Sequence, residues 1–234
     1  MCCADWAPIQ EISVSKSKKS EKVVSLIAAV IDESGSMAGV RTDTIGGYNT
    51  FIEKIRDEQA GKKAYVSTFL FDSSHTRPLV RTLQSGVDIN AATPLSTANY
   101  NPLGGTPLYD AIGLSVASIE KTVKDLGITK VTLLIQTDGE ENSSREYRLG
   151  AIQALLKQKQ EAGWQVIFLG ADLSNAVDIG VNLGVSAVNS MAYAKHNTAE
   201  TFQAMAASTA TYRSCVGSSA EVTLSAQEKA KLAS

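Results

Sequence analysis

Long apolar runs recur along the chain and are separated by stretches with helical periodicity. The runs 23–31, 131–135 and 166–169 consist almost entirely of apolar residues, the pattern of strands buried on both faces of a sheet. Residues 64–71 alternate in polarity as a further strand. Residues 76–82 are predicted to pair with that strand at the sheet edge, because Pro78 excludes them from a central position.

Apolar residues at helical spacing predict helices between these strands. The first helix contains Ile45, Ile52 and Ile55 and ends near Gly61. In the second, Thr106 is predicted to be the N-cap and Pro107 the first helical residue. This second helix is predicted to end near Gly127. Further helices are predicted over about 144–162, from about 173, and from 198 to about 214. A short strand is predicted at 186–188 and a capping box at 225–228.

Strands alternating with amphipathic helices indicate an α/β domain, doubly wound, with a mainly parallel central sheet and helices on both faces. We expect this domain to span residues 22–217. Residues 1–21 are polar and basic with nothing to bury, and are predicted to be a flexible or partner-docked arm. Residues 218–234 are expected to form a tail with a short helix.

Composition narrows the function classes further. The 234 residues are 44% hydrophobic and 20% charged, with a net charge of −2, so no basic excess supports nucleic-acid binding. The longest apolar run, 26–31, is far shorter than a membrane span. Three cysteines, two of them adjacent, do not suggest a disulfide framework, so a reducing compartment is expected. The expected location is the cytoplasm, or the virion if the chain is phage-encoded.

Polar loops follow the buried strands, and ligands of such sheets collect beyond the carboxyl ends of the strands. Asp32, Ser34 and Ser36 alternate after the first strand and can therefore project to one side. Thr106 stands at a helix start, and Asp138 follows a second buried strand. Hydroxyl and carboxylate oxygens with few charges suit Mg²⁺. One coordination position would stay open to an acidic side chain of a protein partner.

These motifs resemble those of von Willebrand factor type A domains. Asp32-Glu33-Ser34-Gly35-Ser36 is similar to the D-x-S-x-S motif of that family, and the segment 104–111 resembles its bacterial and phage form. The resemblance runs in order from about residue 22 to 142. It implies a metal-ion-dependent adhesion site with all five motif positions filled, and Mg²⁺ as the cofactor, with Mn²⁺ or Ca²⁺ as alternatives. The implied metal ligands are Asp32, Ser34, Ser36, Thr106 and Asp138.

Four further acidic residues are assigned to the surroundings of the site. Asp110 recurs in the family motif and is expected to support the ligands without binding metal. Glu33, Glu140 and Glu141 are predicted to lie at the rim, where they would repel wrongly placed acids.

The leading functional hypothesis is a non-enzymatic, metal-dependent protein-binding domain whose partner presents Asp or Glu. Two settings remain open: an adaptor working with an AAA+ ATPase, and a structural component of a phage particle or similar assembly. A scaffold with an idle site is a further alternative. A metal-assisted hydrolase using Asp32 and Asp138 is disfavoured, because the sequence places neither a histidine nor a further carboxylate cluster on these loops beyond the three glutamates.

Overall fold

The computed structural model describes residues 23–58, 63–171, 175–194 and 197–214. Within them the chain forms a six-stranded sheet of order β3-β2-β1-β4-β5-β6. Every neighbouring pair is parallel except β2 and β3. The doubly wound α/β prediction is confirmed. The strands are β1 (Val24–Asp32), β2 (Lys63–Phe71), β3 (Val80–Asp88), β4 (Lys130–Thr137), β5 (Gln165–Ala171) and β6 (Ser190–Tyr193).

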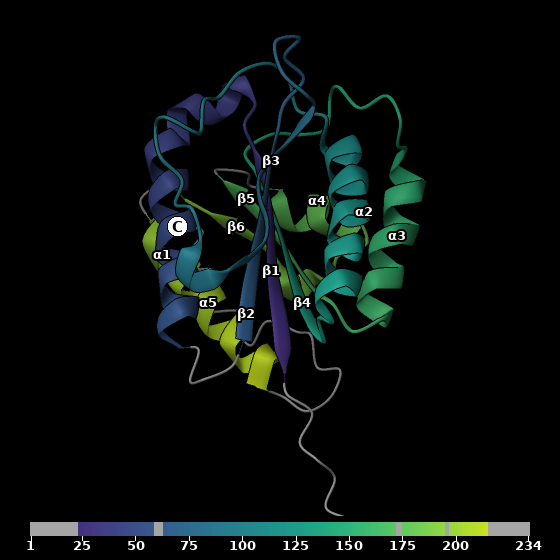
Figure 1. Ribbon diagram of the computed structural model, residues 1–234. Helices are drawn as coiled ribbons and strands as arrows, with labels where there is room; N and C mark the ends of the chain where they lie inside the picture. Colours follow the sequence, from purple (N-terminus) through teal and green to yellow (C-terminus); the bar gives the residue numbers. More distant parts are fainter. Residues whose placement is uncertain (1–22, 59–62, 172–174, 195–196, 215–234) are drawn as a thin grey trace, which may run out of the picture.

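Helices cover both faces of this sheet (Figure 1). On one face, α1 and α5 pack over a core that includes Ile27, Ile31 and Leu134. On the other, α2, α3 and α4 pack over a core that includes Leu26, Val30 and Leu133. The helices are α1 (Arg41–Asp57), α2 (Leu108–Leu126), α3 (Leu149–Glu161), α4 (Ala176–Asn182) and α5 (Thr198–Ser214). None of these helices is long and apolar enough to cross a membrane.

Three predicted elements differ from the structure. The edge strand occupies Val80–Asp88 instead of 76–82, because Pro78 lies in the turn that precedes it. Residues 187–189 form a 3-10 turn, and the last strand follows at Ser190–Tyr193. Helix α3 begins at Leu149, five residues later than predicted. The helix end at Gly127 is confirmed, and this residue adopts the left-handed conformation that suits glycine.

Several predictions concern residues outside the described ranges. These are the N-terminal arm, the C-terminal tail with its capping box, the helix end near Gly61 and the start of the helix near residue 173. The predicted domain boundaries therefore stay predictions.

Helices α1 and α5 approach each other closely at Gly47. A Cβ atom built there would lie 2.4 Å from the Phe202 ring, whose centroid is 6.2 Å from that of Phe51. The neighbouring Gly46 is exposed, and a Cβ there meets nothing within 4 Å. Two adjacent glycines of one helix therefore have opposite structural requirements.

We expect Gly47→Ala to lower the free energy of unfolding by about 2 kcal/mol, because the added methyl overpacks the contact with Phe202. Gly46→Ala, the matched control, should raise it by about 0.5–1 kcal/mol through its better helix propensity. Urea unfolding monitored by circular dichroism measures both. Equal effects of the two substitutions would contradict the packing of α1 on α5.

Candidate metal centre

The candidate ligands lie at the point where the strand order reverses. From the central strand β1 the chain continues to β2 on one side, and later places β4 on the other side. Ile31 of β1 pairs with Gln136 of β4. Asp32 therefore ends its strand beside Thr137, and Asp138 follows directly. This edge is where doubly wound sheets bind ligands.

Hydrogen bonds join four of the five predicted ligands. Asp32 Oδ1 accepts from the backbone N–H of Ser34 at 2.7 Å. The hydroxyl oxygens of Ser34 and Ser36 are 3.0 Å apart, and Ser36 Oγ donates to Asp138 Oδ1 at 2.7 Å. The structure thus confirms that alternate residues of the first loop meet the residue that follows β4.

Thr106, the fifth predicted ligand, borders the same point. A Cβ atom built on Gly139 would lie 3.4 Å from Thr106 Oγ1 and 3.7 Å from Ser36 Oγ. Thr106 is almost fully buried, whereas Ser36 is exposed. The three loops therefore converge, with Ser36 on the solvent side of the cluster.

The spacing of these oxygens fits a small hard cation. Octahedral Mg²⁺ holds ligands at about 2.0–2.1 Å, which places adjacent ligand oxygens about 2.9 Å apart. The Ser34–Ser36 and Ser36–Asp138 oxygen pairs are 3.0 and 2.7 Å apart. The donor set has two carboxylates and three hydroxyls. The described residues contain no group of three or more His, Cys, Asp or Glu that could hold a metal ion. The residues present fit magnesium.

Backbone hydrogen bonds lock the Thr106 loop between its neighbours. Gly104 O accepts from Gly35 N at 2.9 Å, and Gly105 O accepts from Ser73 N at 3.1 Å. A Cβ at Gly104, where φ is +73°, would lie 2.6 Å from Ser74 N. Only glycine fits this close approach and this backbone conformation. The glycines therefore position the threonine.

Thr106 is not the N-cap of α2, contrary to the prediction. The helix begins at Leu108, and its cap is Pro107, which makes no side-chain capping bond. Thr106 instead exchanges hydrogen bonds with Asn142, from N to Oδ1 at 2.8 Å and from Asn142 N to Thr106 O at 3.1 Å. The contact across the loops outweighs local capping, and it leaves the threonine hydroxyl available to the cluster.

Asp110 supports the neighbouring loop instead of the oxygen cluster itself. Its buried carboxylate accepts hydrogen bonds from the backbone N–H groups of Arg145, Glu146 and Tyr147, at 2.7–3.0 Å. These bonds satisfy the amides in an irregular segment. They are the physical reason that α3 starts only at Leu149.

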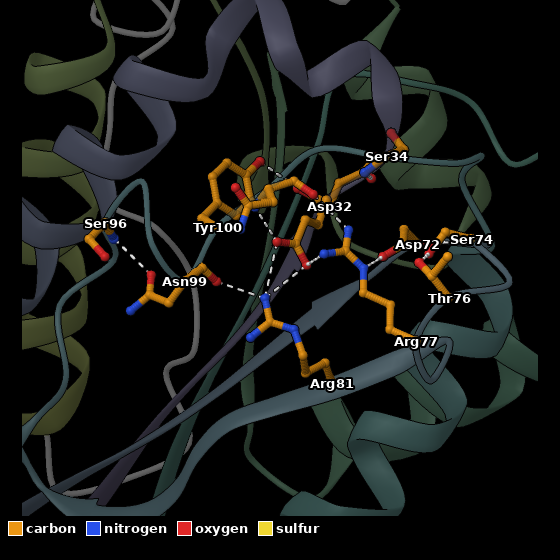
Figure 2. Close-up of polar contacts among 12 residues, drawn as sticks. Asp32, Ser34, Asp72, Ser74, Thr76, Arg77, Arg81, Ser96, Asn99 and Tyr100 are labelled. Carbon is orange, nitrogen blue, oxygen red and sulfur yellow. Dashed lines mark hydrogen bonds and ion pairs between the residues drawn. The ribbon is translucent and has the colours of Figure 1, made fainter.

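Glu33 was predicted to be a rim residue, and this is wrong. Its side chain is fully buried and lies on the side opposite Asp32 and Ser34, because neighbouring residues of an extended segment alternate. It accepts from Arg81 at 3.0 Å and lies 3.4 Å from Arg77. Figure 2 shows the two arginines side by side, with Arg77 also reaching Asp72. Glu33 is thus a structural anchor.

The other two predicted rim residues differ from each other. Glu140 is exposed, and its Oε1 accepts from Asn175 Nδ2 at 3.0 Å. Glu141 is half-buried and accepts from the backbone N–H groups of Tyr109, Ser143 and Ser144. One carboxylate is therefore placed at the rim, and the other stabilises the start of α2.

Burial dominates the electrostatics of Asp32. Desolvation raises the pKa of its carboxyl from the ordinary 3.8 to about 7. Hydrogen bonds from Thr137 and Ser34 lower the pKa, and the nearby negative charge of Asp138 raises it further. The metal-free protein therefore disfavours the ionised form of a group that a cation would stabilise.

Three residues that position the site were missed by the sequence analysis. Thr137 Oγ1 donates to Asp32 Oδ2 at 2.6 Å, and Tyr100 Oη donates to the backbone O of Asp32 at 2.6 Å. Asn142 holds Thr106. A signal for Thr137 existed, because parallel neighbouring strands place the last residues of both side by side. Tyr100 lies 68 residues from Asp32 and gave no such signal.

No family model matches the sequence, and no curated protein resembles it at the level of sequence. Solved structures resemble its fold. The von Willebrand factor domain of the type V pili tip protein Mfa5 from Porphyromonas gingivalis superposes with a TM-score of 0.61 at 11% identity, covering 85% of this chain and 99% of that one.

Two further matches are parts of longer chains. The pilus adhesin SpaC from Lactobacillus rhamnosus GG gives a TM-score of 0.61 at 14% identity over 84% of this chain and 31% of that one. A von Willebrand factor type A protein from Catenulispora acidiphila gives 0.54 at 14% identity, over 81% and 43%. This chain spans less than half the length of both. A von Willebrand factor type A-like fold is thus supported.

We expect Glu33→Gln to lower the free energy of unfolding by about 2–3 kcal/mol, because it removes the buried counter-charge of Arg81 and leaves Arg77 with Asp72 alone. Asp125→Asn is the matched control: it breaks the exposed pair with Lys121 and should change stability by less than about 0.5 kcal/mol. Thermal or urea unfolding measures the stability of both variants. If both lose less than about 0.5 kcal/mol of unfolding free energy, the ion pairs of Glu33 do not stabilise the fold.

The raised pKa of Asp32 predicts a pH dependence of the metal-free protein. The folded state binds a proton that the unfolded state releases, so this contribution to stability is present below about pH 4 and lost as pH rises through 7. In chelator, the stability of the wild type relative to Asp32→Asn should fall by up to about 4 kcal/mol between pH 4 and 8. Urea unfolding at several pH values measures this difference. A difference that is constant with pH would refute the assignment.

Proposed function

We propose that this chain is a non-enzymatic protein-binding domain in which Asp32, Ser34, Ser36, Thr106 and Asp138 hold one Mg²⁺. Mn²⁺ or Ca²⁺ are the alternative ions. The observation that supports this most directly is the convergence of oxygens from three loops. The contacting oxygens of Ser34, Ser36 and Asp138 are 2.7–3.0 Å apart, and Thr106 Oγ1 borders Gly139 beside them. When bound, the ion supplies an electrophilic position for a carboxylate from a partner.

The chain's own residues prepare that position. Glycines and backbone hydrogen bonds fix Thr106, and Thr137 orients Asp32. Ser36 is exposed, so the cluster can be reached from solvent at that point. Leu103, on the loop that bonds to Glu33, exposes 49% of its surface and offers an apolar contact beside the polar cluster. Glu140 would repel acids placed away from the ion.

The arrangement supports binding over catalysis. Both oxygens of Asp32 accept hydrogen bonds within the chain, and Asp138 Oδ1 accepts from Ser36. These hydrogen bonds hold the carboxylates in position, as a binding site requires. Several proteins of similar fold are described as pilus adhesins or pilins, which agrees with a binding role.

The setting of this proposal has two versions. In one, the partner belongs to an AAA+ ATPase system and the protein works in the cytoplasm. In the other, the partner is a virion protein and the domain is part of a phage particle or similar assembly. Both require an exposed Asp or Glu on the partner, and neither requires nucleic acid or a membrane.

The metal site itself is tested by titration with Mg²⁺. We expect Mg²⁺ to raise the melting temperature of the wild type, because a ligand that binds only the folded state stabilises it. Asp138→Asn and Ser36→Ala should each weaken Mg²⁺ binding at least tenfold in calorimetry, whereas the remote Asp125→Asn should bind as the wild type does. A wild type that does not respond to Mg²⁺, Mn²⁺ or Ca²⁺ would refute the proposal and favour a scaffold.

Partner binding is tested by affinity capture from the native source. The immobilised wild type should retain a protein in Mg²⁺ that is absent in chelator and absent from Asp138→Asn. Substitution of the partner's acidic contact residue should abolish the interaction. Metal-independent capture of the same proteins by all variants would contradict a metal-mediated contact.

A further inference from the structure

A cavity of about 400 Å³ lies beside the candidate metal centre, between the start of α2, the segment after β4, and α4. Leu108 and Leu183, both about 1% exposed, line its buried part together with Leu149 and Ile179. Its volume lies in the range of ordinary ligand sites. Glu140 contributes to the lining and stands two residues after Asp138, so the cavity adjoins the cluster.

The mouth of this cavity is acidic. Glu140 and Asp178 are exposed and Glu141 is half-buried, and no lining residue that the structure describes is basic. Glu140 accepts from the amide of Asn175, and Glu141 accepts from backbone amides and a hydroxyl. Among the described residues, none of these carboxylates takes part in a salt bridge. Within the described part of the chain, no ion pair therefore balances their negative charge.

Lys and Arg side chains combine an apolar stem with a cationic end. The stem would lie along the leucine and isoleucine side chains, and the cationic end would meet the carboxylates at the mouth. Tyr109, which lines the cavity and is partly exposed, adds an aromatic face for that cation. An acidic side chain would be repelled by the carboxylates, and a purely apolar one would contact only the leucine and isoleucine side chains.

A second hollow of about 660 Å³ has a different charge. It is lined by Asp72, His75, Arg77 and Arg145 among others, and residues 142–145 of the segment that follows Asp138 contribute to its wall. Arg145 is exposed there. Because Arg77 is paired with Asp72 and Glu33, the exposed Arg145 is the group that would repel a basic side chain at the second hollow.

We propose that the cavity lined by Glu140, Glu141 and Asp178, here called the acidic cavity, binds a Lys or Arg side chain of the partner. This inference rests on the proposed function and deepens it: the partner segment carries an acid for the metal and a basic residue close to it. The two contacts act together, because the first raises the effective concentration of the second.

The acidic cavity can be tested without the metal or the partner. The full ¹⁵N-labelled chain is titrated in chelator with Nα-acetyl-L-arginine methylamide and its lysine analogue, and with the norleucine analogue as the neutral probe. We expect saturable shifts of the backbone amides of Tyr109, Asn175 and Ile179 with the basic probes, and at least threefold weaker binding of norleucine.

Substitutions at Asp178, which lies outside the metal cluster, complete the test. Asp178→Asn should weaken binding of the arginine probe at least threefold, and Asp178→Lys should abolish it. Glu161→Gln, an equal charge change at the exposed end of α3, should leave it unchanged. Equal binding of norleucine, shifts that map elsewhere, or no effect of Asp178→Asn would overturn the inference.

A Mg²⁺ titration of the same samples separates the two proposals. Arginine binding that fails while Mg²⁺ binds normally overturns only the acidic cavity. If Mg²⁺ fails to bind while arginine binds at the mapped amides, the cavity stands and the metal-dependent function falls.

Discussion

The parallel pairing of β1 with β4 is the constraint on which the candidate site depends. It aligns the carboxyl ends of two central strands, so that Asp32 meets Thr137 and Asp138 lies within reach of Ser36. Both strands are buried on both faces, so burial of apolar side chains fixes the spacing of the polar groups at their ends. The packing of the core therefore determines the geometry of the site.

Buried polar contacts extend this support away from the sheet edge. Tyr100 holds the backbone of Asp32, and Gln136 of β4 donates to Tyr193 of β6 at 2.6 Å. Tyr193 in turn stacks edge-on with Phe202 of α5. The face of the sheet beneath the site is thus tied to α5. Buried hydrogen bonds of this kind favour a single arrangement.

Electrostatic charge is distributed unequally around the site. Glu33 is neutralised by two arginines, whereas Asp32 is desolvated without a basic partner within the described contacts. A cation bound next to Asp32 would offset that desolvation. The carboxylates of the acidic cavity make no salt bridge among the described residues, and by the same argument they would favour a different cation, a basic side chain. In the proposed function, two adjacent positions that favour positive charge would give the surface its selectivity.

Sequence alone determined the alternation of strands and helices, and with it the α/β class, because burial on two faces or one face leaves a readable period. It also determined that the alternating oxygens of the first loop, Thr106 and Asp138 would meet. Tertiary structure decided the rest. The ion pair of Glu33, the start of α3 and the capping of α2 depend on Arg81, Asp110 and Glu141, partners 32 to 48 residues away in the chain. Contacts at that separation leave no local pattern, so only the folded chain reveals them.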